Sequence, residues 1–170
     1  METARHDRMV GMDFGPVQTE LLPGARNAIG TCLAVRPQER VALIADRASR
    51  AVAASLAATL DERRAAWQGL LLEDFAQRPL TGAPPEVIEA FETSDVGILC
   101  MQPLPGELGA RMSIVRTVEQ RQIRYAHMVG VTPEIMQQGM LADYHEIDRD
   151  RKSTRLNSSH IQKSRMPSSA

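Results

Sequence analysis

Residues 96–101 have the sequence VGILCM, a compact run of apolar residues between Asp95 and Gln102. An apolar run of this length without alternation is typical of a strand that is buried on both faces of a parallel sheet. The run VALIA, residues 41–45, has the same character. Because such strands must be covered on both sides, the two runs predict a central sheet between layers of helices.

Two more strands and five helices are expected around these runs. Residues 67–72 and 122–128 predict the other strands, and residues 73–83 and 102–106 predict loops. The expected helices cover residues 17–33, 48–60, 85–93 and 107–119, and a last one begins at Thr132-Pro133 and stops at Gly139.

Strands that alternate with helices indicate right-handed β-α-β units. We therefore expect an α/β fold with an open, mostly parallel sheet of about four strands and helices on both faces (Rossmann-like). After the first strand, residues 45–49 are ADRAS in place of the glycine-rich GxGxxG that holds a dinucleotide. The motifs GxxxxGK[ST], GxSxG and HExxH are also missing, so no P-loop, hydrolase elbow or zinc helix is predicted.

The residue usage changes abruptly near position 149. Residues 1–149 contain no lysine and four serines, whereas residues 150–170 contain both lysines and six serines. The string DRKSTRLNSSH, followed after three residues by SRMPSSA, resembles the in-frame translation of a short-read sequencing adapter. We expect an N-terminal extension at 1–16, an α/β domain at 17–149 and a non-native, disordered tail at 150–170.

Without the tail, 15 arginines face 20 acidic residues, a formal net charge of −5. A domain of that sign is not expected to bind nucleic acid. No apolar run approaches the roughly 20 residues that span a bilayer, and the N-terminus lacks a signal-peptide pattern, so a cytoplasmic protein without membrane contact is expected. Cys32 and Cys100 lie far apart, and each is expected to be a buried reduced thiol.

Few residues offer chemistry. Asp46 follows the first strand, where open α/β sheets bind ligands, although an N-cap role also explains it. Met101 ends the third strand, and Arg111 could face the crevice beyond it or be a solvated helix charge. His127 ends the fourth strand, where a hydrogen-bonded structural histidine is favoured over a catalytic one. The sequence predicts no catalytic, cofactor-binding or metal-binding residue, and the acidic residues around His145 are expected to be a polar surface.

Three blocks carry a resemblance to a known family. ELLPGARNAIGTCLAVRPQERVALIAD at 20–46, APPEVIEAFETSDVGILC at 83–100 and VTPEIMQQGMLADYHEI at 131–147 resemble the aminopeptidase T, aminopeptidase S and PepS family of metallo-aminopeptidases. The matching residues belong to helices and strands of the scaffold. The resemblance implies that 17–149 is the N-terminal α/β domain of a two-domain protein.

In that family the C-terminal half holds two divalent metal ions, zinc, cobalt or manganese, and the metal-activated water attacks the peptide carbonyl. The metal ligands are Glu, His and Asp, helped by a Tyr, and none has a matching position before residue 147. The resemblance therefore implies a parent hydrolase that removes N-terminal residues from peptides, acts as a homodimer and continues past about residue 149. This fragment itself would hold no metal and be inactive. The alternative is a stand-alone α/β module that binds a ligand near Asp46 and Met101 without hydrolysis.

Overall fold

The fold is that of a computed structural model, which describes residues 12–138 and 140. Several expectations concern other residues. Most of the extension at 1–16, the helix stop at Gly139, the acidic residues around His145 and the tail at 150–170 lie outside the described residues. The whole predicted sheet lies within them.

Four parallel strands form one sheet in the order β2-β1-β3-β4. The strands are β1 Arg40–Ala45, β2 Ala66–Leu71, β3 Val96–Met101 and β4 Arg124–Val129. The order changes direction between β1 and β3, which is the topological switch point of the sheet. The predicted α/β fold is confirmed, and β3 coincides with the apolar run at 96–101.

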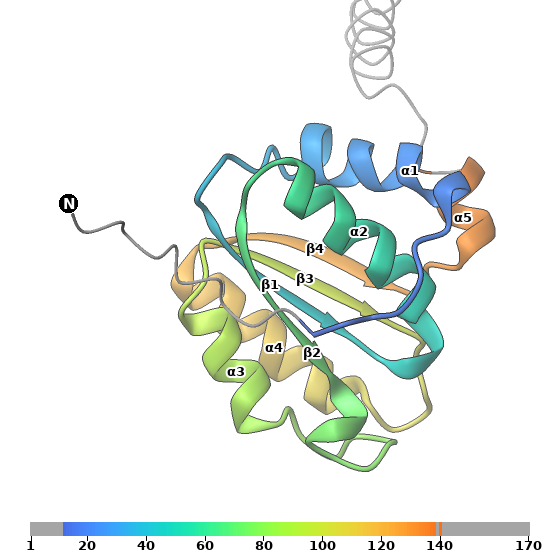
Figure 1. Cartoon of the computed structure of the whole chain (residues 1–170). Coiled ribbons are helices and arrows are strands. Elements are labelled where there is room, and N and C mark those ends of the chain that lie inside the picture. The colour runs from blue at the N-terminus through green and yellow to red at the C-terminus, as the bar shows by residue number, and fades with distance from the viewer. Residues whose placement is uncertain (1–11, 139, 141–170) are drawn as a thin grey trace, which may run out of the picture.

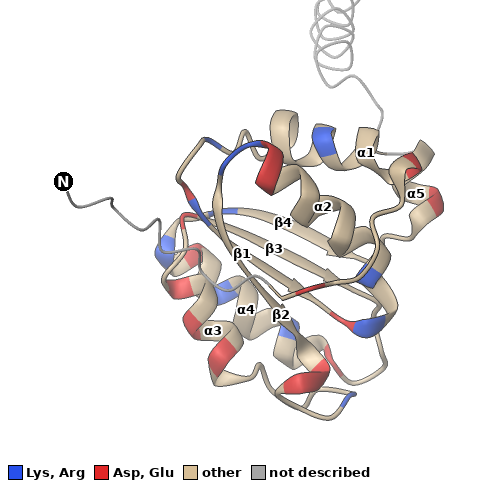
Figure 2. Ribbon diagram, viewed as in Figure 1, with Lys and Arg blue, Asp and Glu red and all other residues tan. Residues whose placement is uncertain are grey.

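Helices cover both faces of this sheet (Figure 1). They are α1 Leu22–Asn27, α2 Arg50–Glu62, α3 Pro85–Glu92, α4 Leu108–Arg121 and α5 Pro133–Gln138. α1, α2 and α5 lie on one face, and α3 and α4 lie on the other (Figure 1). Acidic and basic positions occur in both helical layers (Figure 2).

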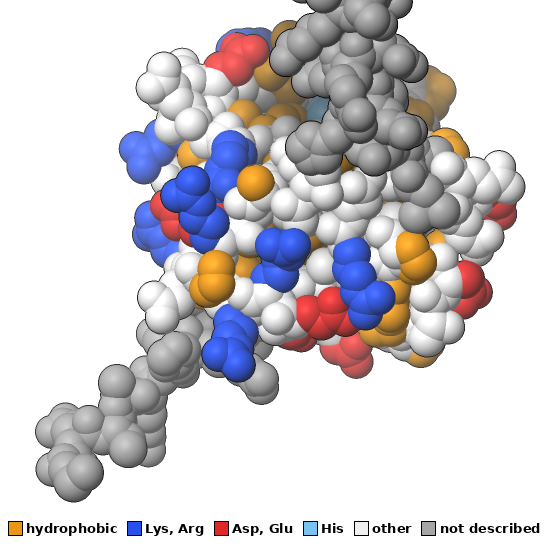
Figure 3. All heavy atoms as spheres, turned by 90° about the horizontal axis from the view of Figure 1, so that it is seen from above, with side chains coloured by type: hydrophobic (Ala, Val, Ile, Leu, Met, Phe, Trp, Pro, Cys, Tyr) orange, Lys and Arg blue, Asp and Glu red, His pale blue; other side chains and the backbone are white. Residues whose placement is uncertain are grey.

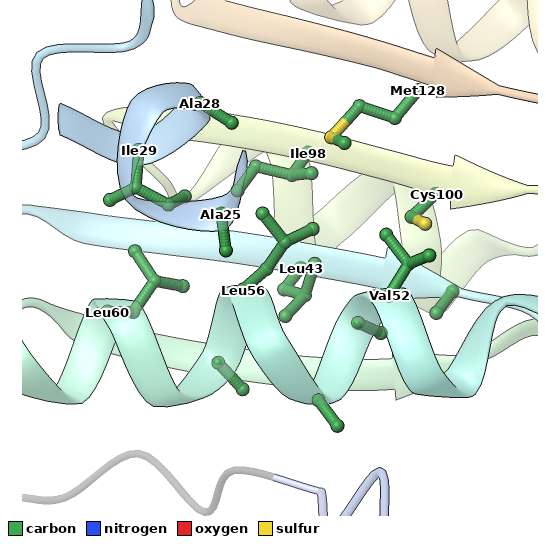
Figure 4. Packing of buried hydrophobic residues seen from close by; sticks show 14 of the residues in the cluster. Ala25, Ala28, Ile29, Leu43, Val52, Leu56, Leu60, Ile98, Cys100 and Met128 are labelled. Carbon is green, nitrogen blue, oxygen red and sulfur yellow. The ribbon is translucent and has the colours of Figure 1, made fainter. Parts of the chain in front are cut away.

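The α1–α2 side of the sheet packs aliphatic strand residues against a helix rich in alanine. Leu43 of β1 and Ile98 of β3 are fully buried against Leu56 of α2 (Figure 4). Each large aliphatic side chain buried in this way contributes roughly 1.5–3 kcal/mol through the hydrophobic effect. On the outer surface of this layer, charges of both signs lie side by side (Figure 3), and Arg26 pairs with Glu62 at 2.8 Å.

The α3–α4 side has its own apolar core. Ile44 and Leu99 point from the sheet toward Phe91 of α3 and Ile114 of α4, and all four side chains are buried. Gly97 of β3 lies under the Phe91 ring, where a Cβ atom would lie 2.7 Å from two ring carbons. The glycine therefore lets the aromatic ring rest directly on the strand.

The first helix differs from the prediction in one consequential detail. The predicted helix at 17–33 consists of a 3-10 turn, Thr19–Leu21, then α1, then a π-helical turn, Ala28–Cys32. In a π-helical turn the backbone hydrogen bonds join residues five apart, whereas in an α-helix they join residues four apart. The last side chains of this helix therefore point in a different direction from those of a regular α-helix. Cys32, the last residue of this turn, is exposed, and the prediction that it is buried was wrong. Cys100 is buried as predicted.

The fourth strand also begins later than the sequence indicated. Gln122 has a φ of +52° and ends α4 in a left-handed conformation. Its N–H bonds to the carbonyl of Glu119 at 3.2 Å, so this residue closes the helix. β4 therefore starts at Arg124 rather than at position 122.

Candidate functional site

The loops after β1, β2 and β3 meet at the carboxyl edge of the sheet, where open α/β folds bind ligands. Asp46 follows β1, and its Oδ1 accepts a hydrogen bond from the Ser49 N–H at 2.8 Å. This bond caps the short 3-10 helix Arg47–Ser49, the role that the sequence offered as an alternative. The Asp46 side chain is fully buried, so its charge needs a partner within the protein.

Arg78 supplies that partner from the loop between β2 and α3. Its Nη1 forms an ion pair with Oδ2 of Asp46, and its Nη2 donates to the carbonyl of Gln102 at 2.6 Å. Nε and Nη2 also bind the two carboxylate oxygens of Glu107 at 2.8 and 2.6 Å. All three guanidinium nitrogens thus form hydrogen bonds within the protein, and the Arg78 side chain is only 8% exposed.

Glu107 lies immediately before α4 and completes the network. Its carboxylate accepts further hydrogen bonds from the N–H groups of Leu80 at 2.9 Å and Leu104 at 3.2 Å. The Arg78 guanidinium, helped by these backbone donors, holds the pKa of Glu107 below its usual value although burial opposes this. The fully buried Glu107 thus ties the 78–80 loop to the start of α4.

The network fills the switch point of the sheet. Oδ2 of Asp46 also accepts from the Gln102 N–H at 2.7 Å, so every carboxylate oxygen of Asp46 and Glu107 has a donor in the protein. Met101 is fully buried in the α3–α4 core and presents no surface at this edge. Glu73, whose side chain is 21% exposed, lies 3.8 Å from Arg78 at the rim of the network. We call the buried group Arg78, Asp46 and Glu107 the carboxyl-edge network; acidic and basic positions both occur at this end of the sheet in Figure 2.

The remaining candidate residues lie elsewhere. Arg111 is one turn into α4 and takes no part in the carboxyl-edge network, so the structure does not bring it together with Asp46. On β4, burial raises the pKa of Tyr125 and lowers the pKa of His127; the positive charge of Arg111 opposes the first effect and adds to the second. The Tyr125 hydroxyl and His127 Nδ1 are 3.1 Å apart, which gives His127 the hydrogen bond that the sequence favoured.

Sequence reasoning missed Arg78 and Glu107, which determine what this edge can do. Arg78 lies in a loop without periodicity, just before Pro79, and its partners are 29 and 32 residues away. The one available signal was positional, because Glu107, like Asp46, lies in a connection that follows a buried strand. Charges at such positions converge at one edge of a parallel sheet, so a buried arginine between them was a testable expectation.

No family model, curated protein or solved structure matches this chain. Among residues 12–138 and 140, no group of three or more His, Cys, Asp or Glu side chains is placed to hold a metal ion. No helix in the described part of the chain has the length and apolar character needed to cross a membrane.

Proposed function

We propose that this chain is the scaffold domain of a metal-dependent aminopeptidase, a hydrolase that removes N-terminal residues from peptides. The carboxyl-edge network is the observation that carries the proposal. In an open α/β sheet this edge is the usual ligand site, and here it is closed by internal ion pairs. A domain that fills its own switch point is suited to supporting a neighbour that carries the chemistry. The resemblance of 20–46, 83–100 and 131–147 to the aminopeptidase T, S and PepS family names that neighbour.

The network weighs against the alternative of a stand-alone module that binds a ligand near Asp46 and Met101. A ligand there would have to displace the Arg78 guanidinium and leave two buried carboxylates without their counter-ion. Removing one partner of a buried ion pair costs about 3–5 kcal/mol, which a small ligand would have to exceed before it gained any affinity.

The proposed parent would use two divalent metal ions to acidify a water and to neutralise the oxyanion that forms when it attacks the peptide bond. The described residues do not fit such a centre, because the buried carboxylates at the sheet edge are already bound by Arg78 and by backbone N–H groups. We therefore assign the metal ligands to residues beyond position 149 and give no step of the reaction to this domain.

The test compares two proteins. The reading frame around codon 149 is recovered from independently sequenced DNA, and the longer chain is expressed beside the 170-residue chain. We expect the longer chain to bind two divalent ions per protomer and to cleave amino-acid p-nitroanilides, and the 170-residue chain to do neither. A native stop codon just after position 147, or stoichiometric zinc uptake by the 170-residue chain in calorimetry, would refute the proposal.

A further inference from the structure

Residues 12–16 form an N-terminal arm that belongs to no helix or strand. Phe14 is the one buried residue of the arm and is only 4% exposed, whereas Asp13 and Pro16 are exposed. Among the described residues, no hydrogen bond between backbone groups joins the arm to a helix or a strand. The arm therefore lies on the domain as a bound peptide would, held by a small number of groups.

The ring of Phe14 rests on strand β2. A Cβ atom on Gly69 would lie 2.7 Å from a ring carbon of Phe14, so the ring occupies the space that a side chain at this position would take. The indole of Trp67 stacks beside it, with ring centroids 6.3 Å apart and 21° between the ring planes. The indole is held in turn by a hydrogen bond from its Nε1 to Oδ1 of Asp61 on α2, at 2.8 Å. The shape of this aromatic site is therefore set by β2 and α2.

Arg50, the first residue of α2, holds the main chain of the arm. Its Nε donates to the carbonyl of Phe14 at 3.2 Å, and its Nη2 donates to the carbonyl of Asp13 at 3.1 Å. The next residue, Gly15, has a φ of +101°, and its N–H bonds to Oδ1 of Asp13 at 2.8 Å, so the chain turns immediately after the ring. One ring and two carbonyls thus bind the arm, and none of these contacts requires the arm to be part of the same chain.

We propose that Gly69, Trp67 and Arg50 form a docking site for a phenylalanine-bearing peptide segment of another protein, and that the N-terminal arm is the internal competitor for this site. An aromatic anchor in an apolar site, with main-chain hydrogen bonds beside it, is a recurring arrangement in peptide recognition. Because so few contacts hold the arm, it can leave the site without unfolding of the domain. The inference does not depend on the proposed aminopeptidase, because the site uses no residue of the carboxyl-edge network.

The test empties the site in the 170-residue chain by Phe14→Ala and adds the peptide MDFGPVQ, which has the sequence of residues 12–18. Trp67 is the single tryptophan of the chain, so the tryptophan fluorescence reports on the site. We expect a saturable fluorescence change with MDFGPVQ and none with MDAGPVQ, in which alanine replaces the phenylalanine. The unaltered chain should bind MDFGPVQ more weakly, because its own arm competes, and this titration does not depend on the folding of a variant.

Second substitutions in the Phe14→Ala chain test the site itself. Arg50→Met should weaken the binding of MDFGPVQ by at least about tenfold, because hydrogen bonds from a charged donor are lost. Gly69→Ala should abolish binding, because the new Cβ takes the place of the phenylalanine ring. Arg116→Met is the matched control, because Arg116 is an exposed arginine on the opposite helical layer, and it should leave the affinity unchanged.

Three results would overturn the proposal. The first is the absence of a fluorescence change with MDFGPVQ in both the Phe14→Ala chain and the unaltered chain. The second is equal binding of the two peptides, or equal affinities in the Arg50, Gly69 and Arg116 variants. The third is a stable complex between the unaltered and Phe14→Ala chains in sedimentation, which would assign the site to the arm of a second copy of this chain.

Discussion

Replacing Arg78 with methionine is the sharpest test of the carboxyl-edge network. The change keeps most of the side-chain volume and removes the one counter-ion, among the residues that the structure describes, that touches both Asp46 and Glu107, each of which is fully buried. Breaking a buried ion pair by removing one partner costs about 3–5 kcal/mol, because the remaining charge stays desolvated. The free energy of unfolding of a native protein is roughly 5–15 kcal/mol, so the variant should still fold but with a large loss of stability.

The same loss of free energy predicts how far the melting temperature should fall. Unfolding entropy is about 2.1 cal/mol/K per residue, or roughly 0.27 kcal/mol/K for about 130 ordered residues. A loss of about 3–5 kcal/mol therefore lowers the melting temperature by roughly 11–18 °C. Urea unfolding followed by circular dichroism measures the free energy directly. Arg116→Met, an exposed arginine on α4, is the control and should change it by less than about 0.5 kcal/mol.

The pH dependence separates an electrostatic cause from simple loss of packing. In the native protein, Arg78 holds the pKa of Glu107 below its usual value, so this stabilisation is present at neutral pH and is lost as pH falls through the lowered pKa. In Arg78→Met, burial without a counter-ion should raise the pKa of Glu107, so the variant loses stability as pH rises through that raised pKa. The deficit should therefore be larger at pH 8 than at pH 5. A deficit below about 1 kcal/mol, or one of equal size at both pH values, would refute the reasoning.

Three further outcomes follow from the packing and the surface charges. Gly24→Ala should destabilise the protein by roughly 1–3 kcal/mol in urea unfolding, because the new Cβ would overlap the Met136 backbone. Gly109→Ala should stabilise it by up to about 1 kcal/mol, because no atom lies within 4 Å of the new Cβ and alanine favours the helix. Changes of the same sign in both variants would contradict this. Native protein should react with a thiol reagent at Cys32 alone, because burial raises the pKa of Cys100 to about 12, and a second thiol should appear only in denaturant. Glu39→Gln should cost about 0.5–1 kcal/mol at pH 7, because the side-chain hydrogen bond from Arg124 lowers the pKa of Glu39. The cost should shrink as pH falls through that lowered pKa. A cost that does not change with pH would exclude the ion pair as its source.

The sheet could be predicted because its strands are specified locally. The runs at 41–45 and 96–101 are apolar without interruption, and each is followed by a turn or loop residue that marks its end. The helix starts at Pro85 and Pro133 were equally clear, since proline fits the first helical turn. These features depend on a few neighbouring residues, so a single sequence is sufficient to predict them.

The candidate site could not be predicted in the same way, because its pairs join distant segments. Helical spacing favours a Glu107–Arg111 pair, but Arg78 reaches Glu107 from a different loop and takes both of its oxygens. Arg124 likewise bonds to the carbonyls of Leu33 and Ala34, about 90 residues earlier in the chain. The three-dimensional arrangement of the loops decides which arginine pairs with a given carboxylate, and local sequence patterns carry no information about this arrangement.

The carboxyl-edge network also constrains the order in which the molecule assembles. Arg78 joins the loops after β1 and β3, across 32 and 29 residues of chain, so its bonds can close only when both strands already lie side by side. We expect a folding nucleus built from the apolar strands to form before these contacts, in which case the contacts would act mainly on the rate of unfolding. On this expectation, Arg78→Met would leave the folding rate nearly unchanged and would raise the unfolding rate.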